Sequence, residues 1–160
     1  MDVFLNDNQT MKAVIQRVSK ASVAIDSKMV AKIGKGVLVL LGIEMEDTQE
    51  DINWLSKKIA NLRIFNDHNG VMNHSLIDDK GDCIVVSQFT LYASTKKGNR
   101  PSYIKAANPS VAIPLYEKFI TQMQKELGKD IQTGQFGADM MLEIFNDGPV
   151  TIIIDSKNKF

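Results

Sequence analysis

The segment VLVLLGI, residues 37–43, is apolar at almost every position, and the run CIVV at residues 83–86 has the same character. A strand with one face in water alternates apolar and polar residues, so an unbroken apolar run indicates a strand buried on both faces. A chain of 160 residues is long enough to bury such strands within one domain. We therefore expect a single domain built around a central sheet, with no linker.

Other strands are predicted at both ends of the chain. MKAVIQRV, ASVAID and MVAKI lie between residues 11 and 33, and Ser-Lys pairs separate them. Their spacing predicts an antiparallel meander. Gly34-Lys35-Gly36 is typical of a hairpin turn and lacks the GK[ST] that completes a phosphate-binding loop. IQTGQF, MMLEIF and VTIIID predict three more strands near the C-terminus.

Two segments have helical periodicity. In TQEDINWLSKKIANL, apolar residues recur three or four positions apart, and Thr48 and Asp51 fit a capping box. A second helix is predicted from Pro109 to Leu127 with Asn108 as its cap. Pro114 falls inside this range and predicts either a later start or a kink, because proline cannot donate a helical hydrogen bond.

A hairpin is predicted between the helices. RIF and VMN flank NDHNG, where Asn69 and Gly70 would supply the positive φ angles of a tight turn. His68 and His74 flank this hairpin, but six residues apart and without a nearby cysteine they do not fit a metal site. We expect no metal and no cofactor. Antiparallel strands combined with two helices predict an α+β domain.

The charge of the chain is balanced, with 19 lysines and arginines against 19 aspartates and glutamates. A bound polyanion must therefore meet a local cationic patch. Cys83 lies in an apolar run and is expected to be a buried thiol, not a nucleophile. No apolar run approaches the ~20 residues of a membrane span, and the first ten residues lack the features of a secretion signal, so we expect a cytoplasmic protein without membrane association.

The patterned sequence begins at Met11. We expect residues 1–10 to be an N-terminal extension, for which disorder is the simplest expectation, residues 11–155 to form the domain, and residues 156–160 to be a C-terminal tail.

Ser87, Gln88 and Thr90 follow the apolar run CIVV. Side chains alternate along a strand, so we expect Gln88 and Thr90 to share one face and Ser87, Phe89 and Leu91 to share the other. A structural interpretation is that Gln88 and Thr90 pair across the sheet or face solvent. A functional interpretation is that the strand ends at a pocket, where Thr90 and backbone N–H groups hold a carbonyl oxygen. Neither histidine lies in a local pattern that would supply a base, so a Ser-His-Asp triad is not expected.

The stretch Asn146-Asp147-Gly148-Pro149 separates MMLEIF from VTIIID and predicts a turn between two strands. An X-Pro bond is cis in only about one case in twenty, so the pattern alone does not predict a cis bond. A cis bond would make the stretch a rigid projection with its carbonyl groups held in fixed directions.

Four cations, Lys96, Lys97, Arg100 and Lys105, fall within ten residues and are interleaved with Tyr103. A solvated surface loop accounts for them without a function. If they contact phosphates, they supply the local patch that the balanced charge requires.

SQFTL at 87–91 and NDGPVT at 146–151, in this order and at this separation, resemble the signature pair of the D-aminoacyl-tRNA deacylase family. The likeness extends through IQRVSKASV, GVLVLLGI, RIFND, GNRPSY and QTGQFGADM, and it spans residues 11 to 155. It implies a β-barrel-like α+β fold with two main helices and a homodimer with each active site at the subunit interface. The implied reaction is hydrolysis of the ester between a D-amino acid and the 3′-terminal ribose of tRNA.

The resemblance also implies roles for particular residues. The reaction pocket would be formed by Ser87, Gln88, Phe89 and Thr90. Gly148 and Pro149, joined by a cis bond, would reach in from the partner subunit and exclude L-amino acids, and Arg17 would help to hold them. Lys96, Lys97 and Arg100 become candidates for contacts with tRNA. Glycine mischarged on tRNA(Ala) has no side chain to be blocked and is an expected further substrate.

The mechanism stays open between Thr90 as nucleophile and a substrate-assisted reaction. An aminoacyl ester is already activated, so a site that positions water or a ribose hydroxyl needs no strong base. The missing base near Thr90 favours this second mechanism. Two other functions also stay open: a non-catalytic RNA-binding module of the same fold, and a general esterase that uses Thr90 or Ser87.

Overall fold

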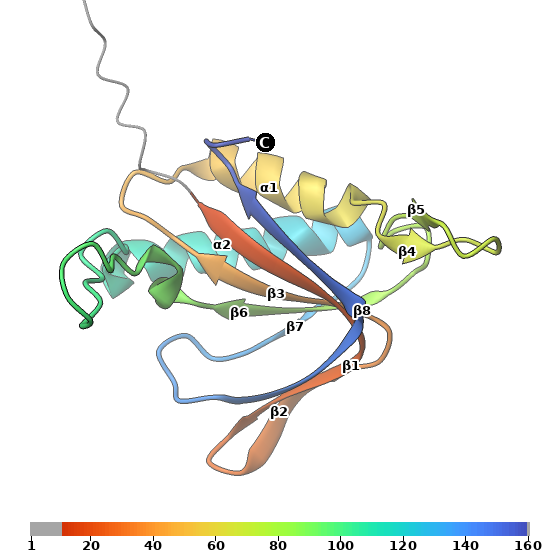
Figure 1. Cartoon of the computed structure of the whole chain (residues 1–160), viewed down its shortest axis with the longest axis horizontal. Helices are drawn as coiled ribbons and strands as arrows, with labels where there is room; N and C mark the ends of the chain where they lie inside the picture. The colour runs from red at the N-terminus through yellow and green to blue at the C-terminus, as the bar shows by residue number, and fades with distance from the viewer. Residues whose placement is uncertain (1–10, 160) are drawn as a thin grey trace, which may run out of the picture.

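The structure is a computed structural model that describes residues 11–159, so the predicted N-terminal extension lies outside the described residues. A six-stranded mixed sheet in the order β2-β1-β3-β6-β7, with β8 on the other edge of β1, carries the fold (Figure 1). Its strands are β1 (Lys12–Ile25), β2 (Lys28–Ile33), β3 (Gly36–Gly42), β6 (Asp82–Ser87), β7 (Gln132–Thr133) and β8 (Met141–Asp155).

Two helices, α1 (Gln49–Asn61) and α2 (Pro109–Leu127), pack together on one side of this sheet (Figure 1). A short 3₁₀ helix, η1 (Phe89–Tyr92), follows β6, and β4 (Phe65–Asn66) and β5 (Met72–His74) form a separate hairpin. The sheet curls until β2 contacts β6 and β7. The predicted α+β class with a barrel-like sheet is confirmed. Neither long helix in residues 11–159 combines the length and apolar character needed to span a membrane.

The central strand β3 is buried on both faces, as its sequence predicts. It lies between β1, which is antiparallel to it, and β6, which is parallel to it. Val37 and Val39 pack in the core that includes both helices, whereas Leu38 packs with Ile84 in a second core inside the curl of the sheet.

The predicted meander is wrong in two places. Ser19 and Lys20 do not form a turn, because β1 continues through them with a local register shift. Gly34-Lys35-Gly36 does not close a hairpin, because β2 and β3 each pair with β1 instead of with each other. Both run antiparallel to β1, on the edge of β1 opposite to β8. The physical need for Gly36 is a close backbone approach, since a Cβ there would lie 1.9 Å from the carbonyl oxygen of Asp82.

The predicted helix ends are confirmed. The Asp51 carboxylate accepts the Thr48 N–H at 2.9 Å, and the Asn108 side chain accepts the Val111 N–H at 3.3 Å. A later start of α2 at Pro114 is wrong. The carbonyl that Pro114 cannot bond belongs to exposed Ser110 in the first turn, where water can satisfy it.

The predicted β4–β5 hairpin is confirmed, although only Gly70 of the pair has a positive φ, at 75°. The C-terminal prediction of three strands needs correction. IQTGQF contributes only the two residues of β7, and MMLEIF and VTIIID are parts of one strand, β8.

Candidate active site

The first signature stretch leaves the sheet at Ser87. Gln88 donates its N–H to the Leu41 carbonyl at 2.7 Å, and the Leu91 N–H then bonds the Gln88 carbonyl at 3.2 Å, which starts η1. The predicted strand alternation through residues 87–91 is therefore wrong. Gly42 permits the turn, because a Cβ there would lie 2.9 Å from the Tyr92 ring.

Gln88 and Thr90 are brought together by this turn, and the Gln88 amide donates to the Thr90 hydroxyl oxygen. The two side chains thus pair with each other and not across the sheet. An amide orients a hydroxyl but cannot remove its proton at neutral pH, so this contact does not make Thr90 a strong nucleophile. Phe89 and Thr90 occupy the first turn of η1, where backbone N–H groups have no partner within the helix.

A cavity of about 310 Å³ opens beside this turn. Ser87, Gln88 and Phe89 line one wall, and the segment 136–140 lines another. Thr90, the fourth residue predicted for the pocket, is not among the lining residues and reaches the wall only through its hydrogen bond with Gln88. Asp139 is the only ionisable residue among the described residues of the lining, which contains no histidine. Residue-by-residue reasoning missed the segment 136–140, and its only sequence signal is the resemblance of QTGQFGADM to the deacylase family.

The second signature stretch bulges out of β8. Asn146 pairs with Val18 and Thr151 pairs with Gln16, so residues 147–150 stand opposite Arg17 alone. The predicted turn is therefore wrong, because the strand continues beyond the bulge. The Gly148–Pro149 peptide bond is cis, as the resemblance implies, and residues 147–149 are exposed.

Arg17 lies under this bulge with 7% of its surface exposed. Its Nε donates to the Asp147 carbonyl at 3.0 Å, and its Nη1 donates to the Ile64 carbonyl at 2.7 Å. The Asp147 carboxylate lies 3.5 Å from the same Nε. One guanidinium therefore joins the bulge to the chain that enters the β4–β5 hairpin.

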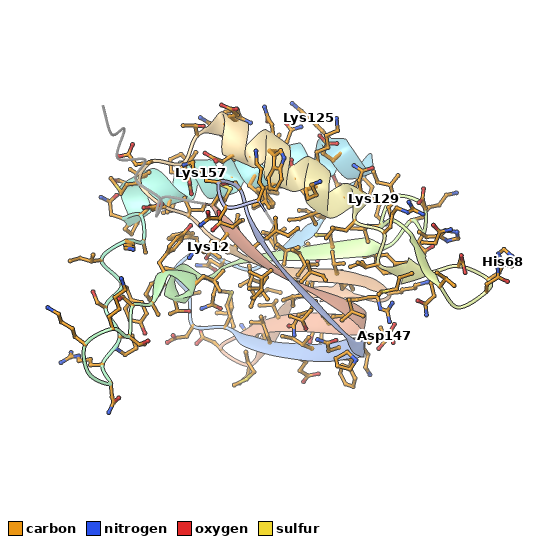
Figure 2. The ribbon with its side chains drawn as sticks, turned by 45° about the horizontal axis from the view of Figure 1, so that its top comes forward. Lys12, His68, Lys125, Lys129, Asp147 and Lys157 are labelled. Carbon is orange, nitrogen blue, oxygen red and sulfur yellow. The ribbon has the colours of Figure 1, made fainter. Side chains whose placement is uncertain are left out.

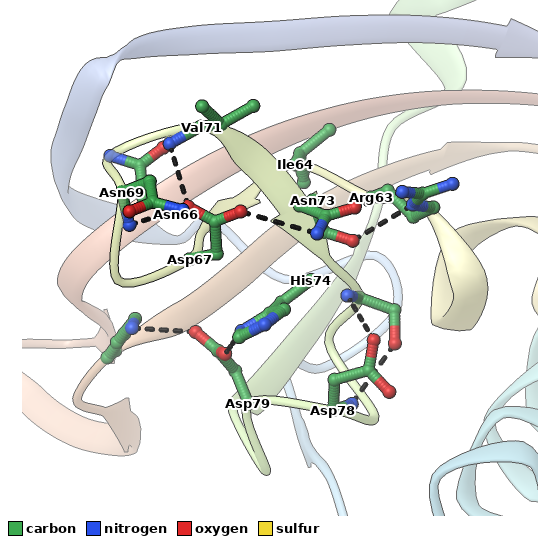
Figure 3. Close-up of polar contacts among 12 residues, drawn as sticks. Arg63, Ile64, Asn66, Asp67, Asn69, Val71, Asn73, His74, Asp78 and Asp79 are labelled. Carbon is green, nitrogen blue, oxygen red and sulfur yellow. Dashed lines mark hydrogen bonds and ion pairs between the residues drawn. The ribbon is translucent and has the colours of Figure 1, made fainter.

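The hairpin on which Arg17 rests has its own polar bracing (Figure 3). The Asp67 carboxylate accepts the N–H groups of Val71 at 3.1 Å and Asn69 at 2.8 Å, and it also bonds the Asn73 side chain. These hydrogen bonds, that of Val71 first, hold the pKa of Asp67 below its usual value. The ionised carboxylate is the form that accepts these hydrogen bonds, and they tie the turn of the hairpin together.

The two signature stretches of one chain do not meet. In the register of the sheet, Arg17 pairs with Val37 on β3, and Val37 pairs with Cys83 on β6. Ser87 lies four residues beyond Cys83 along β6. Three strand spacings of ~4.8 Å and four residues of ~3.3 Å give a separation of roughly 20 Å. In Figure 2, Asp147 and Lys12 lie toward opposite ends of the sheet, and Lys12 contacts the ring of Tyr92 in η1.

The cations predicted to contact tRNA lie on a separate loop. Lys96, Lys97 and Arg100 are exposed, and paired backbone hydrogen bonds between Ser94 and Ser102 close the base of the loop. They do not line the 310 Å³ cavity. No group of three or more His, Cys, Asp or Glu side chains in residues 11–159 is arranged to hold a metal ion.

The Cys83 thiol is buried, as its sequence predicts, and burial raises its pKa to about 12. At neutral pH it is therefore protonated and inert.

The chain is similar to known proteins over nearly all of its length. The family model described as D-Tyr-tRNA(Tyr) deacylase matches residues 14–155. Two bacterial proteins named D-aminoacyl-tRNA deacylase, from Flavobacterium psychrophilum and Parabacteroides distasonis, are 70% and 65% identical over 149 residues, which cover 93% of this chain and 99% of each relative.

Solved structures share the fold. The c-Myc DNA unwinding element binding protein has a TM-score of 0.84 and 42% identity over 89% of this chain and 97% of its own. A probable eukaryotic D-amino acid tRNA deacylase has a TM-score of 0.81 over 92% of this chain and 100% of its own, and at 19% identity it supports the fold alone.

Proposed function

Because the chain belongs to the D-Tyr-tRNA(Tyr) deacylase family and is therefore a hydrolase, we propose that it cleaves the ester between a D-amino acid and the 3′-terminal ribose of tRNA. The products are the free amino acid and tRNA. The observation that carries this proposal is the high sequence identity, 70% and 65% over 93% of this chain, with two bacterial proteins named D-aminoacyl-tRNA deacylase. The activity resides in residues 11–155, and a tRNA substrate agrees with the predicted cytoplasmic location.

The reaction takes place in the cavity beside η1. Ser87, Gln88 and Phe89 form its wall, and the first N–H groups of η1 stabilise the negative charge that develops on the ester oxygen. The Thr90 hydroxyl, which bonds Gln88 and does not line the cavity, helps to position the substrate through Gln88 and does not attack it. Water or a ribose hydroxyl of the substrate attacks the activated ester, since no residue that lines the cavity is a strong base.

Chiral selection requires a second copy of the chain. Gly148 and Pro149 are exposed and lie roughly 20 Å from Ser87 of the same chain, too far to touch the same substrate. In a homodimer, the bulge of one copy enters the cavity of the other and blocks the side-chain direction of an L-amino acid. Arg17 holds the bulge in place.

A steric block of this kind acts on the direction of a side chain and not on its chemistry. The enzyme therefore accepts D-amino acids of many kinds. Glycine has no side chain to be blocked, so glycine mischarged on tRNA(Ala) is a further substrate.

The test compares hydrolysis of D-tyrosyl-tRNA and L-tyrosyl-tRNA by the purified protein, with a metal chelator present throughout. Loss of the D-ester alone is the expected result. Loss of neither ester despite binding of tRNA would replace the enzyme with a non-catalytic RNA-binding module. Equal loss of both esters would indicate a general esterase without chiral selection.

A further inference from the structure

A second hollow lies on the other side of η1. Its volume is about 300 Å³, and three lysines, Lys12, Lys96 and Lys105, line it. We call it the lysine groove. Whereas Gln88 and Phe89 line the reaction cavity, Leu91 and Tyr92 from the other half of η1 line the lysine groove.

The lysines of this groove come from two parts of the chain, because Lys96 and Lys105 belong to the basic loop and Lys12 belongs to β1. Lys12 lies at the start of β1, where it pairs with both β3 and β8, and its Nζ lies 5.1 Å from the centre of the Tyr92 ring. Lys96 follows the Ser94–Ser102 backbone pair that closes its loop. Lys105 precedes Ala107, whose N–H bonds the Ile43 carbonyl at 2.9 Å. The fold therefore adds Lys12 to two lysines of the basic loop, and the local run of charge alone does not make the groove.

The side chains that line the groove carry a net positive charge. Asp155 is the only carboxylate among the described residues that line it, and its Oδ1 already accepts the N–H groups of Lys157 and Asn158, each at 3.0 Å. None of the three lysines has a carboxylate partner among the ion pairs of residues 11–159. Three cations against one hydrogen-bonded carboxylate suit an anionic ligand.

From this placement we propose that the lysine groove binds the phosphodiester backbone of the single-stranded 3′ end of tRNA, next to the terminal nucleotide. The proposal rests on the proposed function, which puts the terminal ribose in the reaction cavity. At a rise of ~2 Å per residue, the four residues of η1 separate cavity and groove by only about 8 Å. A strand that leaves the cavity over η1 enters the groove directly. The exposed loop tip, with Lys97 and Arg100, does not line this path.

The test uses a groove variant with Lys12→Gln, Lys96→Gln and Lys105→Gln. Its matched control carries Lys28→Gln, Lys32→Gln and Lys57→Gln, which remove the same charge from exposed positions outside the groove. Because Lys12 is half-buried, a second variant with only Lys96→Gln and Lys105→Gln guards against a loss of folding.

Binding of uncharged tRNA is measured across a salt titration. Three lost phosphate contacts make the slope of log K against log salt less negative by about 2, and two lost contacts by about 1.4. Affinity at low salt falls about ten- to a hundredfold in the groove variant and less than about twofold in the control. A groove variant that binds like the control would overturn the proposal.

Hydrolysis of two esters then separates this proposal from the proposed function. The ratio of kcat/KM for D-tyrosyl-tRNA to that for D-tyrosyl-adenosine, which has no phosphate, falls in the groove variant mainly through a higher KM for tRNA. An equal loss for both esters would show that the lysines support the reaction cavity, and the proposal would be wrong. If the unmodified protein hydrolyses neither ester but binds tRNA through the groove, the proposed function fails and the phosphate site stands.

Discussion

The substitution Arg17→Lys weakens the hydrogen bonding that supports the bulge but keeps the positive charge at residue 17. The guanidinium donates to two backbone carbonyls, those of Asp147 and Ile64, from two different nitrogens. A lysine keeps the positive charge but has a single nitrogen, so it cannot reproduce this fork. Arg17→Lys therefore loses at least one charge-assisted hydrogen bond. The loss falls at a buried position, because Arg17 is only 7% exposed.

The expected cost of Arg17→Lys is about 1.5–3 kcal/mol of unfolding free energy, the contribution of one charge-assisted hydrogen bond. A domain of this size is stable by roughly 5–15 kcal/mol, so the variant remains folded. If the bulge excludes L-amino acids, weaker attachment of the bulge to residue 17 lowers the preference for D-tyrosyl-tRNA over L-tyrosyl-tRNA. A loss of ~1.4 kcal/mol of discrimination lowers the D to L ratio of kcat/KM tenfold.

Urea unfolding and the D to L ratio are measured on the same preparations, with Arg63→Lys as the control. Arg63 donates to the Asn73 carbonyl at 2.9 Å, but it is exposed and does not touch the bulge, so the expected change in stability is within about 0.5 kcal/mol. Two results would refute the reasoning. In one, Arg17→Lys is as stable as the control; in the other, stability falls while the D to L ratio is unchanged.

Three further predictions concern single residues. Gly148→Ala places a Cβ 3.1 Å from Arg17 Nη2 at a φ of 131° and is expected to cost about 1–3 kcal/mol in urea unfolding and to lower kcat/KM for D-tyrosyl-tRNA. Gly70→Ala, at a φ of 75° with nothing within 4 Å, is the control for backbone conformation alone, and an equal effect on kcat/KM would contradict the prediction. Burial raises the pKa of Asp47 to about 7, so the folded protein holds this proton more tightly than the unfolded chain, and the stabilisation present below pH ~4 is lost as pH rises through 7. Asp47→Asn is expected to remove this decrease of the unfolding free energy with pH, measured by urea unfolding between pH 4.5 and 7.5. An unchanged decrease would show that another group causes it. Thr90→Val lowers kcat by no more than about a hundredfold if Thr90 only positions the substrate, whereas complete loss of hydrolysis, together with a trapped acyl intermediate in the unmodified enzyme, would make Thr90 the nucleophile.

The helix ends were predictable because their signals are local. Asn108 and Pro109 specify the start of α2 through a side-chain cap and a fixed φ, and both act within one turn. The burial of β3 on both faces was equally predictable, because it depends on an uninterrupted apolar run in the sequence.

The wrong turns share a different cause. Glycine and proline mark positions where the backbone departs from a regular strand, but they do not say whether the chain then reverses. Gly36 is needed because the Asp82 carbonyl lies opposite it, and β8 continues past Pro149 because β1 pairs with both of its halves. Both reasons lie in contacts with residues far away in the sequence.

The candidate site was predictable only in part. The residue types of SQFTL and NDGPVT, together with their resemblance to a family, predict that these two stretches contribute to the site. The acceptors of Arg17 could not be predicted from residue types, because they are backbone carbonyls, which every residue carries. Lys12 is far from the basic loop in sequence and joins it only through the pairing of β1 with β3 and β8.

The central claim is that the bulge of one copy completes the cavity of another, and crosslinking tests it most directly. Two variants with different tags, Phe89→Cys and Asp147→Cys, are mixed and treated with a short bis-maleimide; both positions are exposed, and Cys83 is buried and inert. The expected product is a covalent dimer that carries both tags, while Lys57→Cys mixed with Asp147→Cys yields none. Absence of the mixed dimer under conditions where both cysteines react would contradict a site built from two chains.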